Sequence, residues 1–385
     1  MSDALPPLPP PASFAVDLLI VSAEHSGDAH AARMVLELRA KKPDVRVCAL
    51  GGPRLAAAGA QLLRDLTVGS TMGFAVLAKI SFYRALIAEI VRWVGEHRPR
   101  AVCFVDSSGL NLRIARGLFE RGFSAKAGGP TRTLYYISPQ VWASRAGRRF
   151  AMAQHLDGVA AIFPFEPAVY ADTTLPVEFV GHPFLSDAYQ LPVTFDAAGP
   201  ILLLPGSRRA VVKRVFPVLL EAFSRCGSEK NSVALYPSEE IRALLEQLKA
   251  RSPVGARVEL RAGGGAAVGG AAVLTASGTM SLECALAGIP GALTYKTDPL
   301  TYFLGRMLVK VDYIGIANLL LKEAMYPEFI QGAATPAALA AQLRECLDDP
   351  ARLARTREQA ARLRELLHAP TQGSAADWVL RHLNY

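Results

Sequence analysis

Polar residues follow most of the short apolar runs of this sequence, at the positions where strands would end. Their types suit chemistry, because carboxylates can take up a proton, while imidazole, hydroxyl and amide groups can bind a polar ligand. In an open α/β sheet, ligands bind just outside the carboxyl ends of the strands, so these residues form the candidate site. In the first half of the chain they are Glu24, His25, Ser26, Asp28, Asp106, Gln140, Trp142 and His182.

The turn at 24–28, which reads Glu-His-Ser-Gly-Asp, lies between an apolar run at 16–21 and a helical pattern. Many α/β proteins hold a nucleotide at such a turn. This one has neither the G-x-G-x-x-G pattern of dinucleotide sites nor the G-x-x-x-x-G-K-[ST] loop of triphosphate sites. The sequence therefore excludes those two loops here and leaves open what the polar turn binds.

Each of these residues also has a plainer interpretation. A serine or aspartate at the start of a helix often caps it, for about 1 kcal/mol, and this would account for Ser26, Asp28 and Asp106. His182 precedes a proline and would be a hydrogen-bonded turn residue, while Trp142 would be an ordinary core side chain. Residue types alone leave both interpretations open.

Two stretches in the second half predict an anion site. In the run LPGSR at 204–208, a glycine turn and Ser-Arg precede a helix, so backbone N–H groups and a guanidinium would surround a phosphate. The run ASGT at 276–279 opens another helix, and Glu283 is placed to accept both hydroxyls of a ribose. The plainer interpretation of LPGSR is a structural turn, and that of Glu283 is an exposed charge on a helix. The candidates are Gly206, Ser207, Arg208, Ser277, Gly278, Thr279 and Glu283, with Tyr295 and Lys296 after a further apolar run.

The apolar runs alternate with helical patterns along the chain, which predicts parallel sheets covered by helices on both faces. A turn-rich break at 186–200 separates two such series. We therefore expect an α/β protein with two Rossmann-like halves. The expected parts are a disordered Pro-rich leader over 1–13, a first domain over 14–188, a second over 189–350, and C-terminal helices over 351–385 that pack back on the first.

Two such domains with an anion and ribose site on the second predict a nucleotide-sugar enzyme whose cleft lies between the domains. The sequence has no D-x-D triplet, so we expect no dedicated metal–diphosphate clamp. Arg208 and helix dipoles would then take the charge of the leaving diphosphate.

Composition narrows the partners only a little. Lys plus Arg exceed Asp plus Glu by 42 − 34 = 8, which suits an anionic ligand, an anionic membrane surface or nucleic acid. The basic residues are scattered and no aromatic stacking platform accompanies them, so a nucleic-acid binder is the least favoured class. The 5 cysteines lie far apart and predict reduced core residues.

No apolar run is long enough for a transmembrane helix, and the N-terminus does not read as a secretory signal. A basic amphipathic helix near 82–100 either rests on an anionic leaflet or is an ordinary surface helix.

Eleven motifs in order resemble the lipid-A-disaccharide synthase family of bacterial glycosyltransferases, and they extend over nearly the whole chain. Each is weak alone, but together and in this order they are specific. They are EHSGD (24–28), GGPRLAAAGAQ (51–61), MGF (72–74), YYISPQVWASRAGR (135–148), FPFE (163–166), FVGHP (179–183), LLPGSR (203–208), ASGTMSLECALAGIP (276–290), YKTDPLTY (295–302), LVKVDYIGIANLL (308–320) and PEFIQ (327–331).

The resemblance implies a GT-B fold, with two Rossmann-like domains facing across a cleft. It implies transfer of 2,3-diacylglucosamine from its UDP derivative to the 6-hydroxyl of 2,3-diacylglucosamine 1-phosphate (lipid X), with inversion and without metal or cofactor. It also implies a cytoplasmic protein held peripherally at the inner membrane, and a homodimer is an open expectation.

The resemblance also assigns roles. Asp106 matches the essential aspartate, as general base or as the group that orients it, and Glu24 and Asp28 belong near the reacting centre. The turn at 24–28 would thus bind a sugar hydroxyl or sugar phosphate. On the acceptor side we expect Ser26, His25, Asn111, Gln140, Trp142 and His182. For UDP-sugar binding the implied set is Gly206, Ser207, Arg208, Ser277, Gly278, Thr279, Glu283, Tyr295, Lys296, Lys310, Asn318 and Gln331.

The chain departs from the family pattern near the expected acceptor side. The pattern D-x-P-D-F-N becomes DSSGLN, with Gly109 for the second aspartate, and QVWAWR becomes QVWASR, with Ser144 for a tryptophan. An acidic residue is missing from MGFAVLAK (72–79), and LPN becomes IAN. Two alternatives therefore remain: a relative that binds a UDP-sugar or lipid without turnover, and another GT-B enzyme such as a UDP-N-acetylglucosamine epimerase.

Overall fold

The computed structural model describes residues 5–67, 76–186, 189–298 and 311–384, with the backbone alone at 76–80. The chain forms two compact units. Unit 1 extends to Pro183 and resumes at Ala369, and unit 2 is Phe184–His368. The first crossover thus comes five residues before the expected boundary at 188/189.

A seven-stranded sheet forms the centre of unit 1, and all of its strand pairs are parallel. The spatial order is β3-β2-β1-β4-β5-β6-β7. Successive strands are added outward on one side as far as β3, and the chain then returns to the other side of β1. The strands are β1 (Leu18–Val21), β2 (Val47–Gly51), β3 (Gln61–Asp65), β4 (Ala101–Val105), β5 (Arg132–Tyr136), β6 (Gly158–Ala161) and β7 (Val177–Phe179).

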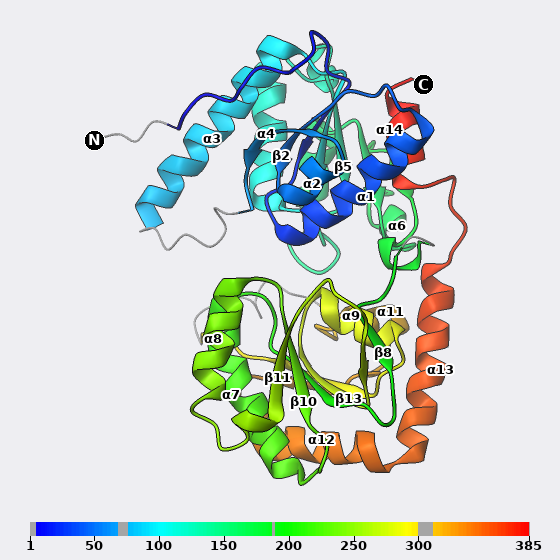
Figure 1. Ribbon diagram of the computed structural model, residues 1–385. Helices are drawn as coiled ribbons and strands as arrows, with labels where there is room; N and C mark the ends of the chain where they lie inside the picture. Colours follow the sequence, from blue (N-terminus) through cyan, green and yellow to red (C-terminus); the bar gives the residue numbers. More distant parts are fainter. Residues whose placement is uncertain (1–4, 68–75, 187–188, 299–310, 385) are drawn as a thin grey trace. The chain divides into compact units, whose positions relative to one another are not determined.

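Helices cover this sheet on both faces, as the apolar runs predict. β1, β2 and β4 are buried at every position, which is typical of central parallel strands. In Figure 1, α1, α2 and α14 lie together, and α3 lies beside α4. The main helices are α1 (His25–Lys41), α2 (Pro53–Ala57), α3 (Val76–His97), α4 (Ser108–Glu120), α5 (Arg148–His155), α6 (Glu166–Val169) and α14 (Ala375–His382).

Unit 2 repeats this plan with its own core. Its six-stranded parallel sheet has the order β11-β10-β9-β13-β14-β15, and β8 pairs with β12 beside it. The strands are β8 (Val193–Phe195), β9 (Ile201–Leu204), β10 (Ser232–Tyr236), β11 (Val258–Ala262), β12 (Val268–Gly270), β13 (Ala272–Ala276), β14 (Gly291–Tyr295) and β15 (Glu328–Ile330). The helices are α7 (Arg209–Cys226), α8 (Glu239–Lys249), α9 (Thr279–Leu286), α11 (Ile316–Leu321), α12 (Pro336–Asp348) and α13 (Pro350–Leu367). All five cysteines are free and buried.

The two C-terminal helices belong to different units, which corrects the expectation that both pack on the first domain. α13 stays with unit 2, where the buried Arg352 donates to the carbonyl oxygens of Gly291 and Met325. Only α14 returns to unit 1, where it lies beside α1 (Figure 1).

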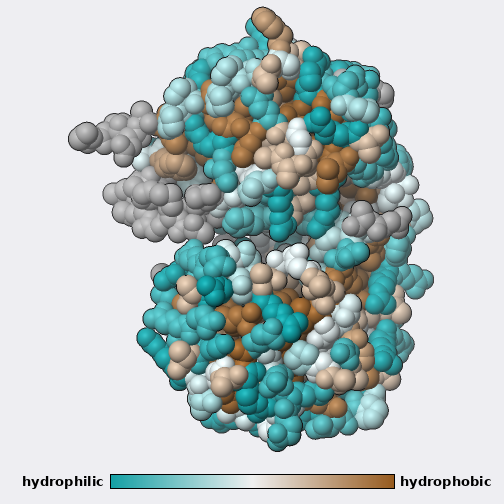
Figure 2. Space-filling model, viewed as in Figure 1, coloured by the Kyte–Doolittle hydropathy of each residue, from teal (hydrophilic) through white to brown (hydrophobic). Residues whose placement is uncertain are grey.

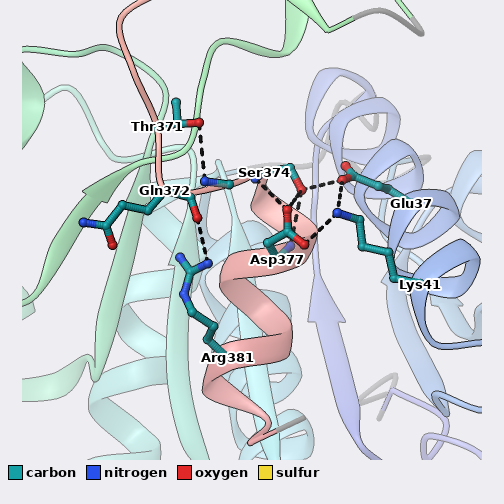
Figure 3. Close-up of polar contacts among 8 residues, drawn as sticks. Glu37, Lys41, Thr371, Gln372, Ser374, Asp377 and Arg381 are labelled. Carbon is teal, nitrogen blue, oxygen red and sulfur yellow. Dashed lines mark hydrogen bonds and ion pairs between the residues drawn. The ribbon is translucent and has the colours of Figure 1, made fainter.

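Polar contacts hold α14 in place (Figure 3). Ser374 and Asp377 form a capping box at its first turn, and Lys41 of α1 donates to Asp377 Oδ1 at 2.6 Å. Ser374 Oγ also donates to Glu37 Oε1. These bonds satisfy the N-terminus of α14 and join it to the first helix of the chain.

The Pro-rich leader is ordered from residue 5, against the expectation of disorder. Leu8 is buried, and its N–H donates to Glu89 of α3 at 2.5 Å. The indole of Trp93 donates to the carbonyl oxygen of Pro9 at 2.9 Å. The leader is therefore part of the packing of α3.

The face drawn in Figure 2 shows hydrophobic residues in scattered groups among hydrophilic ones. The charged side of α3 is less basic than its sequence suggests, since Arg92 pairs with both Glu89 and Glu96. In the part of the chain that the structure describes, no helix has the length and apolar character needed to cross a membrane.

Candidate functional site

In unit 1 the strand order reverses between β1 and β4, so the loops that follow these strands lie side by side at one edge of the sheet. Such a point is where open α/β sheets bind ligands. The loop after β1 carries Glu24, and the loop after β4 carries Asp106. The fold thus brings together two loops, far apart in the sequence, that each carry a carboxylate.

Asp106 and Ser107 both have left-handed backbone conformations, with φ of 51° and 45°. Two consecutive non-glycine residues of this kind are costly, about 1–3 kcal/mol each, and such strain gathers at functional sites. The backbone of Asp106 is held firmly: its N–H donates to Tyr136 O at 3.3 Å, and its carbonyl accepts from Asn111 Nδ2 at 2.8 Å and from the hydroxyl of Tyr135. The backbone of this half-buried residue is therefore held from three directions.

Gly27 allows α1 to begin close to this loop. A Cβ at this position would lie 2.5 Å from Ser22 Oγ and 3.6 Å from Asp106 Cβ. The first contact is too short for any side chain, so only glycine fits without a shift. The glycine in the turn at 24–28 thus sets the approach of the first helix to the β4 loop.

Asn111 and Asp28, both expected to act on substrate, are buried and bonded to backbone. Asn111 Nδ2 donates to Val21 O at 3.4 Å and Val105 O at 3.2 Å, besides the bond to Asp106, so it ties the ends of β1 and β4 together. The Asp28 carboxylate accepts from the N–H of Gly52, at 2.8 Å, and from two N–H groups of α2. It caps the neighbouring helix rather than its own. The structure thus gives both side chains a positioning role.

An aromatic group follows β5, β6 and β7. Trp142, Phe163, Phe165 and His182 contact one another, with Phe163 and Phe165 stacked at 5.8 Å and His182 over Phe163 at 5.4 Å. Glu166 lies beneath them. Its carboxylate accepts from Trp142 Nε1 at 3.3 Å and from the N–H groups of Ile162 and Phe163, just after β6, at 3.1 and 3.0 Å.

Burial changes the protonation of two members of this group. It raises the pKa of Glu166 to about 7, although the hydrogen bonds from the backbone just after β6 and from Trp142 act in the opposite direction. Burial, with a smaller effect from His30, lowers the pKa of His182 to about 3, so this imidazole is neutral at physiological pH. Sequence reasoning placed Trp142 and His182 at the site but missed Phe163, Phe165 and Glu166, although the motif FPFE contains all three.

The remaining unit 1 candidates lie at the surface of the same edge. Glu24, His25 and Gln140 are exposed, and Ser26 is half-buried. Glu24 is the N-cap residue of α1, whose first turn carries His25 and Ser26. These side chains are accessible to a ligand at the β1 and β5 ends.

In unit 2 the strand order reverses between β9 and β13, and the two expected anion loops follow these strands. A Cβ on Gly206 would lie 3.6 Å from Ala276 Cβ, so the loops are neighbours. Gly206 has φ of 95°, and Gly278 has φ of 157° with ψ of −171°, a conformation almost confined to glycine. The structure brings together the exposed residues Gly206, Ser207, Arg208, Gly278 and Thr279, with Ser277 half-buried.

This edge is suited to an anion. Arg208 is the N-cap residue of α7 and Gly278 that of α9, and neither helix has a side-chain cap. The first N–H groups of α7 and its positive dipole end thus lie beside the guanidinium. Ser277 Oγ donates to Ile314 O at 3.1 Å, so its hydroxyl also fixes the loop.

Three further unit 2 candidates are engaged with protein groups. Glu283 is buried, and its Oε1 accepts a hydrogen bond from the hydroxyl of Tyr189. Asn318 is buried between Tyr326, which it bonds in both directions, and Glu328. Both polar atoms of the Gln331 side chain bond the backbone of Thr297, at 3.1 and 3.2 Å.

Glu328 was missed by the sequence reasoning. It accepts from Ile314 N, Gly315 N and Asn318 Nδ2, and so fixes the start of α11. Tyr295 and Lys296 are half-buried at the end of β14, while Lys310 lies outside the described residues. Within the described ranges, no three His, Cys, Asp or Glu side chains are grouped to hold a metal ion.

Solved structures share this fold at low sequence identity. The glycosyltransferase of kitacinnamycin is 16% identical with a TM-score of 0.58, over 96% of this chain and 99% of that chain. MurG of Acinetobacter baumannii is 13% identical with a TM-score of 0.52, over 96% and 99%. S. aureus MnaA, in a co-structure with UDP, is 12% identical with a TM-score of 0.59, over 96% of each chain. At such identities the likeness shows the fold alone, which is of the GT-B class.

Sequence comparison defines the family. The family model for lipid-A-disaccharide synthetase matches residues 18–382. The lipid-A-disaccharide synthase of Geobacter metallireducens is 34% identical over 371 residues, 91% of this chain and 92% of the relative. That of Anaeromyxobacter sp. (strain K) is 35% identical over 364 residues, with the same coverage. The chain belongs to the lipid-A-disaccharide synthase family and is a glycosyltransferase of lipid A biosynthesis.

Proposed function

We propose that the chain transfers 2,3-diacylglucosamine from its UDP derivative to the 6-hydroxyl of 2,3-diacylglucosamine 1-phosphate. The products are the β-1,6-linked disaccharide 1-phosphate and UDP. The support is membership of the lipid-A-disaccharide synthase family together with two strand-reversal sites of different chemistry, one acidic and one cationic.

The observation that carries the residue assignment is the strained, firmly held Asp106 at the strand reversal of unit 1. Its carboxylate accepts the proton of the acceptor 6-hydroxyl while that oxygen bonds to C1 of the donor sugar. The bond between C1 and the diphosphate oxygen breaks on the opposite face, so an α-linked donor gives a β-linked product. Glu24 lies at the adjoining loop and orients the sugar hydroxyls, while Asp28 and Asn111 hold these loops in place.

The leaving UDP carries the electron pair of the broken bond, and unit 2 stabilises it. Arg208 and the N-termini of α7 and α9 bear the diphosphate charge, which removes the need for a metal. Glu283 binds the ribose once its bond to Tyr189 is exchanged for bonds to the hydroxyls.

The test is to incubate the protein with UDP-2,3-diacylglucosamine and lipid X in the presence of EDTA and to follow UDP and disaccharide by mass spectrometry. Disaccharide formation supports the proposal. UDP release without disaccharide would point to another acceptor, and neither product with intact UDP binding would favour a relative without turnover.

Asp106→Asn provides the decisive variant. Loss of the base is expected to lower kcat by about 10²–10⁴-fold and to leave UDP affinity unchanged, because Asp106 lies on unit 1. Full activity in this variant would exclude Asp106 as the base.

We also propose that the protein works at the inner surface of the cytoplasmic membrane, since both substrates carry acyl chains. Co-sedimentation with phosphatidylglycerol vesicles tests this; on α3, the ion pairs of Arg92 with Glu89 and Glu96 offset one of the positive charges that could contribute to the binding.

A further inference from the structure

Three arginines of unit 1 lie within electrostatic range of one another near the loop after β4. Arg113 lies one turn into α4, Arg145 lies in the loop after β5, and Arg148 is the first residue of α5. Arg148 is half-buried, and its Nη1 lies 3.5 Å from Ser108 Oγ, two residues after Asp106.

None of these three guanidiniums has a carboxylate partner among the described residues, whereas other arginines on the same helices do. Arg149, next in sequence, pairs with Asp172, and Arg116 pairs with Glu120. Arg113 and Arg145 are exposed, but Arg148 is half-buried. A partly desolvated charge without a counter-charge is costly, so the position of Arg148 suits an anionic ligand.

The electrostatics of Arg148 agree with this geometry. Burial lowers its pKa, and the positive charges of Arg145 and Arg113 lower it further. The phenol of Tyr135 is within electrostatic range of both Asp106 and Arg148. Together with the contact between Arg148 and Ser108, this places Arg148 near the loop that carries Asp106.

We propose that Arg148, assisted by Arg145 and Arg113, binds the phosphomonoester of the acceptor sugar; this rests on the proposed function. The 6-hydroxyl and the 1-phosphate of a pyranose both lie on the ring-oxygen side, so groups that bind them must lie within one sugar of each other. Arg148 fits this condition through its contact with Ser108, which follows Asp106 by two residues in the same loop. A guanidinium binds a phosphate through two parallel hydrogen bonds, which fixes the orientation of the sugar as well as its affinity.

The test compares Arg148→Gln with the matched control Arg149→Gln, using lipid X and its dephosphorylated analogue as acceptors in neutral detergent micelles. In Arg148→Gln, kcat/KM for lipid X is expected to fall about 10- to 100-fold, with kcat/KM for the analogue and UDP affinity unchanged. Arg149→Gln is expected to match the wild type with both acceptors. Arg148→Lys keeps the charge but loses the paired hydrogen bonds. Its kcat/KM for lipid X is expected to lie between those of the wild type and Arg148→Gln.

An equal loss with both acceptors, or no loss with lipid X, would overturn the proposal. If the wild type makes no disaccharide, the proposed function fails, but binding of lipid X and of the analogue to the same proteins still decides the subsite. An anionic lipid headgroup presents the same chemistry. If Arg148→Gln loses binding to phosphatidylglycerol vesicles but keeps its KM for lipid X, the arginines bind membrane and the acceptor subsite is excluded.

Discussion

At the scale of single residues, carboxylates that follow strands in this chain differ in role because their surroundings differ. The carboxylate of Asp28 accepts hydrogen bonds from three backbone N–H groups, and that of Glu166 is buried beside aromatic rings. Asp106 has its backbone bonded on both sides and its carboxylate at the edge of the sheet. The first two therefore shape the loops, and the third is the carboxylate to which we assign the catalytic role in our proposal.

Arg208→Gln is the residue-scale test of the anion site in unit 2. Loss of a charge-assisted bond to the diphosphate is expected to weaken UDP binding by about 10- to 100-fold, measured by calorimetry. Arg209→Gln is the matched control, since the guanidinium of Arg209 is already paired with Glu240. Equal UDP affinity in both variants would contradict the phosphate site.

Glu166 and His182 predict a pH dependence of stability with opposite signs. The folded pKa of His182, about 3, is below its ordinary value of 6.5, so its stabilisation is present above pH 6.5 and lost as pH falls. The folded pKa of Glu166, about 7, is above 4.5, so its stabilisation is fully present below pH 4.5 and lost as pH rises through 7.

As pH falls from about 6.5 to about 5, His182 lowers the free energy of unfolding and Glu166 raises it. Each changes it by up to about 1.4 kcal/mol per pH unit. Over the same fall in pH, Glu166→Gln keeps only the His182 effect, so its free energy of unfolding is expected to drop by up to about 2 kcal/mol more than that of the wild type. His182→Asn keeps only the Glu166 effect, so its free energy of unfolding is expected to drop by up to about 2 kcal/mol less. Urea unfolding at both pH values measures this. Parallel pH profiles for all three proteins would refute the shifted pKa values.

At the scale of elements, the site in unit 1 depends on how closely α1 approaches the end of β4. The loop after β1 turns within three residues, and Gly27 then lies against Ser22 and near Asp106. The nearest obstacle to a side chain at position 27 is one hydroxyl, while the next contact, Val105 O, is an ordinary 3.5 Å away.

Gly27→Ala is therefore expected to shift α1, lowering kcat and costing about 1–3 kcal/mol of stability. Removing the obstructing atom should reverse this, so the double variant Gly27→Ala/Ser22→Ala is expected to recover most of both losses. Ser22→Ala alone serves as the control. If the double variant is no better than Gly27→Ala, close packing at this point is not the reason for the glycine.

At the scale of the whole molecule, the chain leaves unit 1 at Pro183 and returns to it at Ala369. The last helix then completes unit 1 through the contacts of α14 with α1 (Figure 3). Unit 1 is thus built from both ends of the chain, and its stability depends on residues far from the site.

Asp377→Ala removes both the capping box and the ion pair with Lys41. It is expected to destabilise α14 by about 1–2 kcal/mol, seen as faster amide hydrogen exchange in that helix. Lys41→Gln, which spares the cap, is expected to cost less than about 1 kcal/mol. Because the bond to Lys41 lowers the pKa of Asp377, the stabilisation is present above the ordinary aspartate pKa and lost in acid. Unchanged exchange in Asp377→Ala would mean that apolar packing alone holds α14.

The sequence by itself determined the fold class and the family. Runs of buried strand residues and helix periodicity are local patterns, so the two parallel-sheet halves could be read directly, and the confirmed family followed from eleven ordered motifs. The candidate loops could also be found, because the residues after strands are identified once the strands are.

The tertiary structure decided which side chain does what within those loops. Asp28, Asn111 and Asn318 have residue types that suit a ligand, yet each is buried and bonded to protein groups supplied by other segments. The raised pKa of Glu166, and the lack of a carboxylate partner for Arg148 within the described ranges, could not be read from the sequence for the same reason. Burial, pKa and pairing depend on which distant segments pack around a group, and only the folded chain brings those segments together.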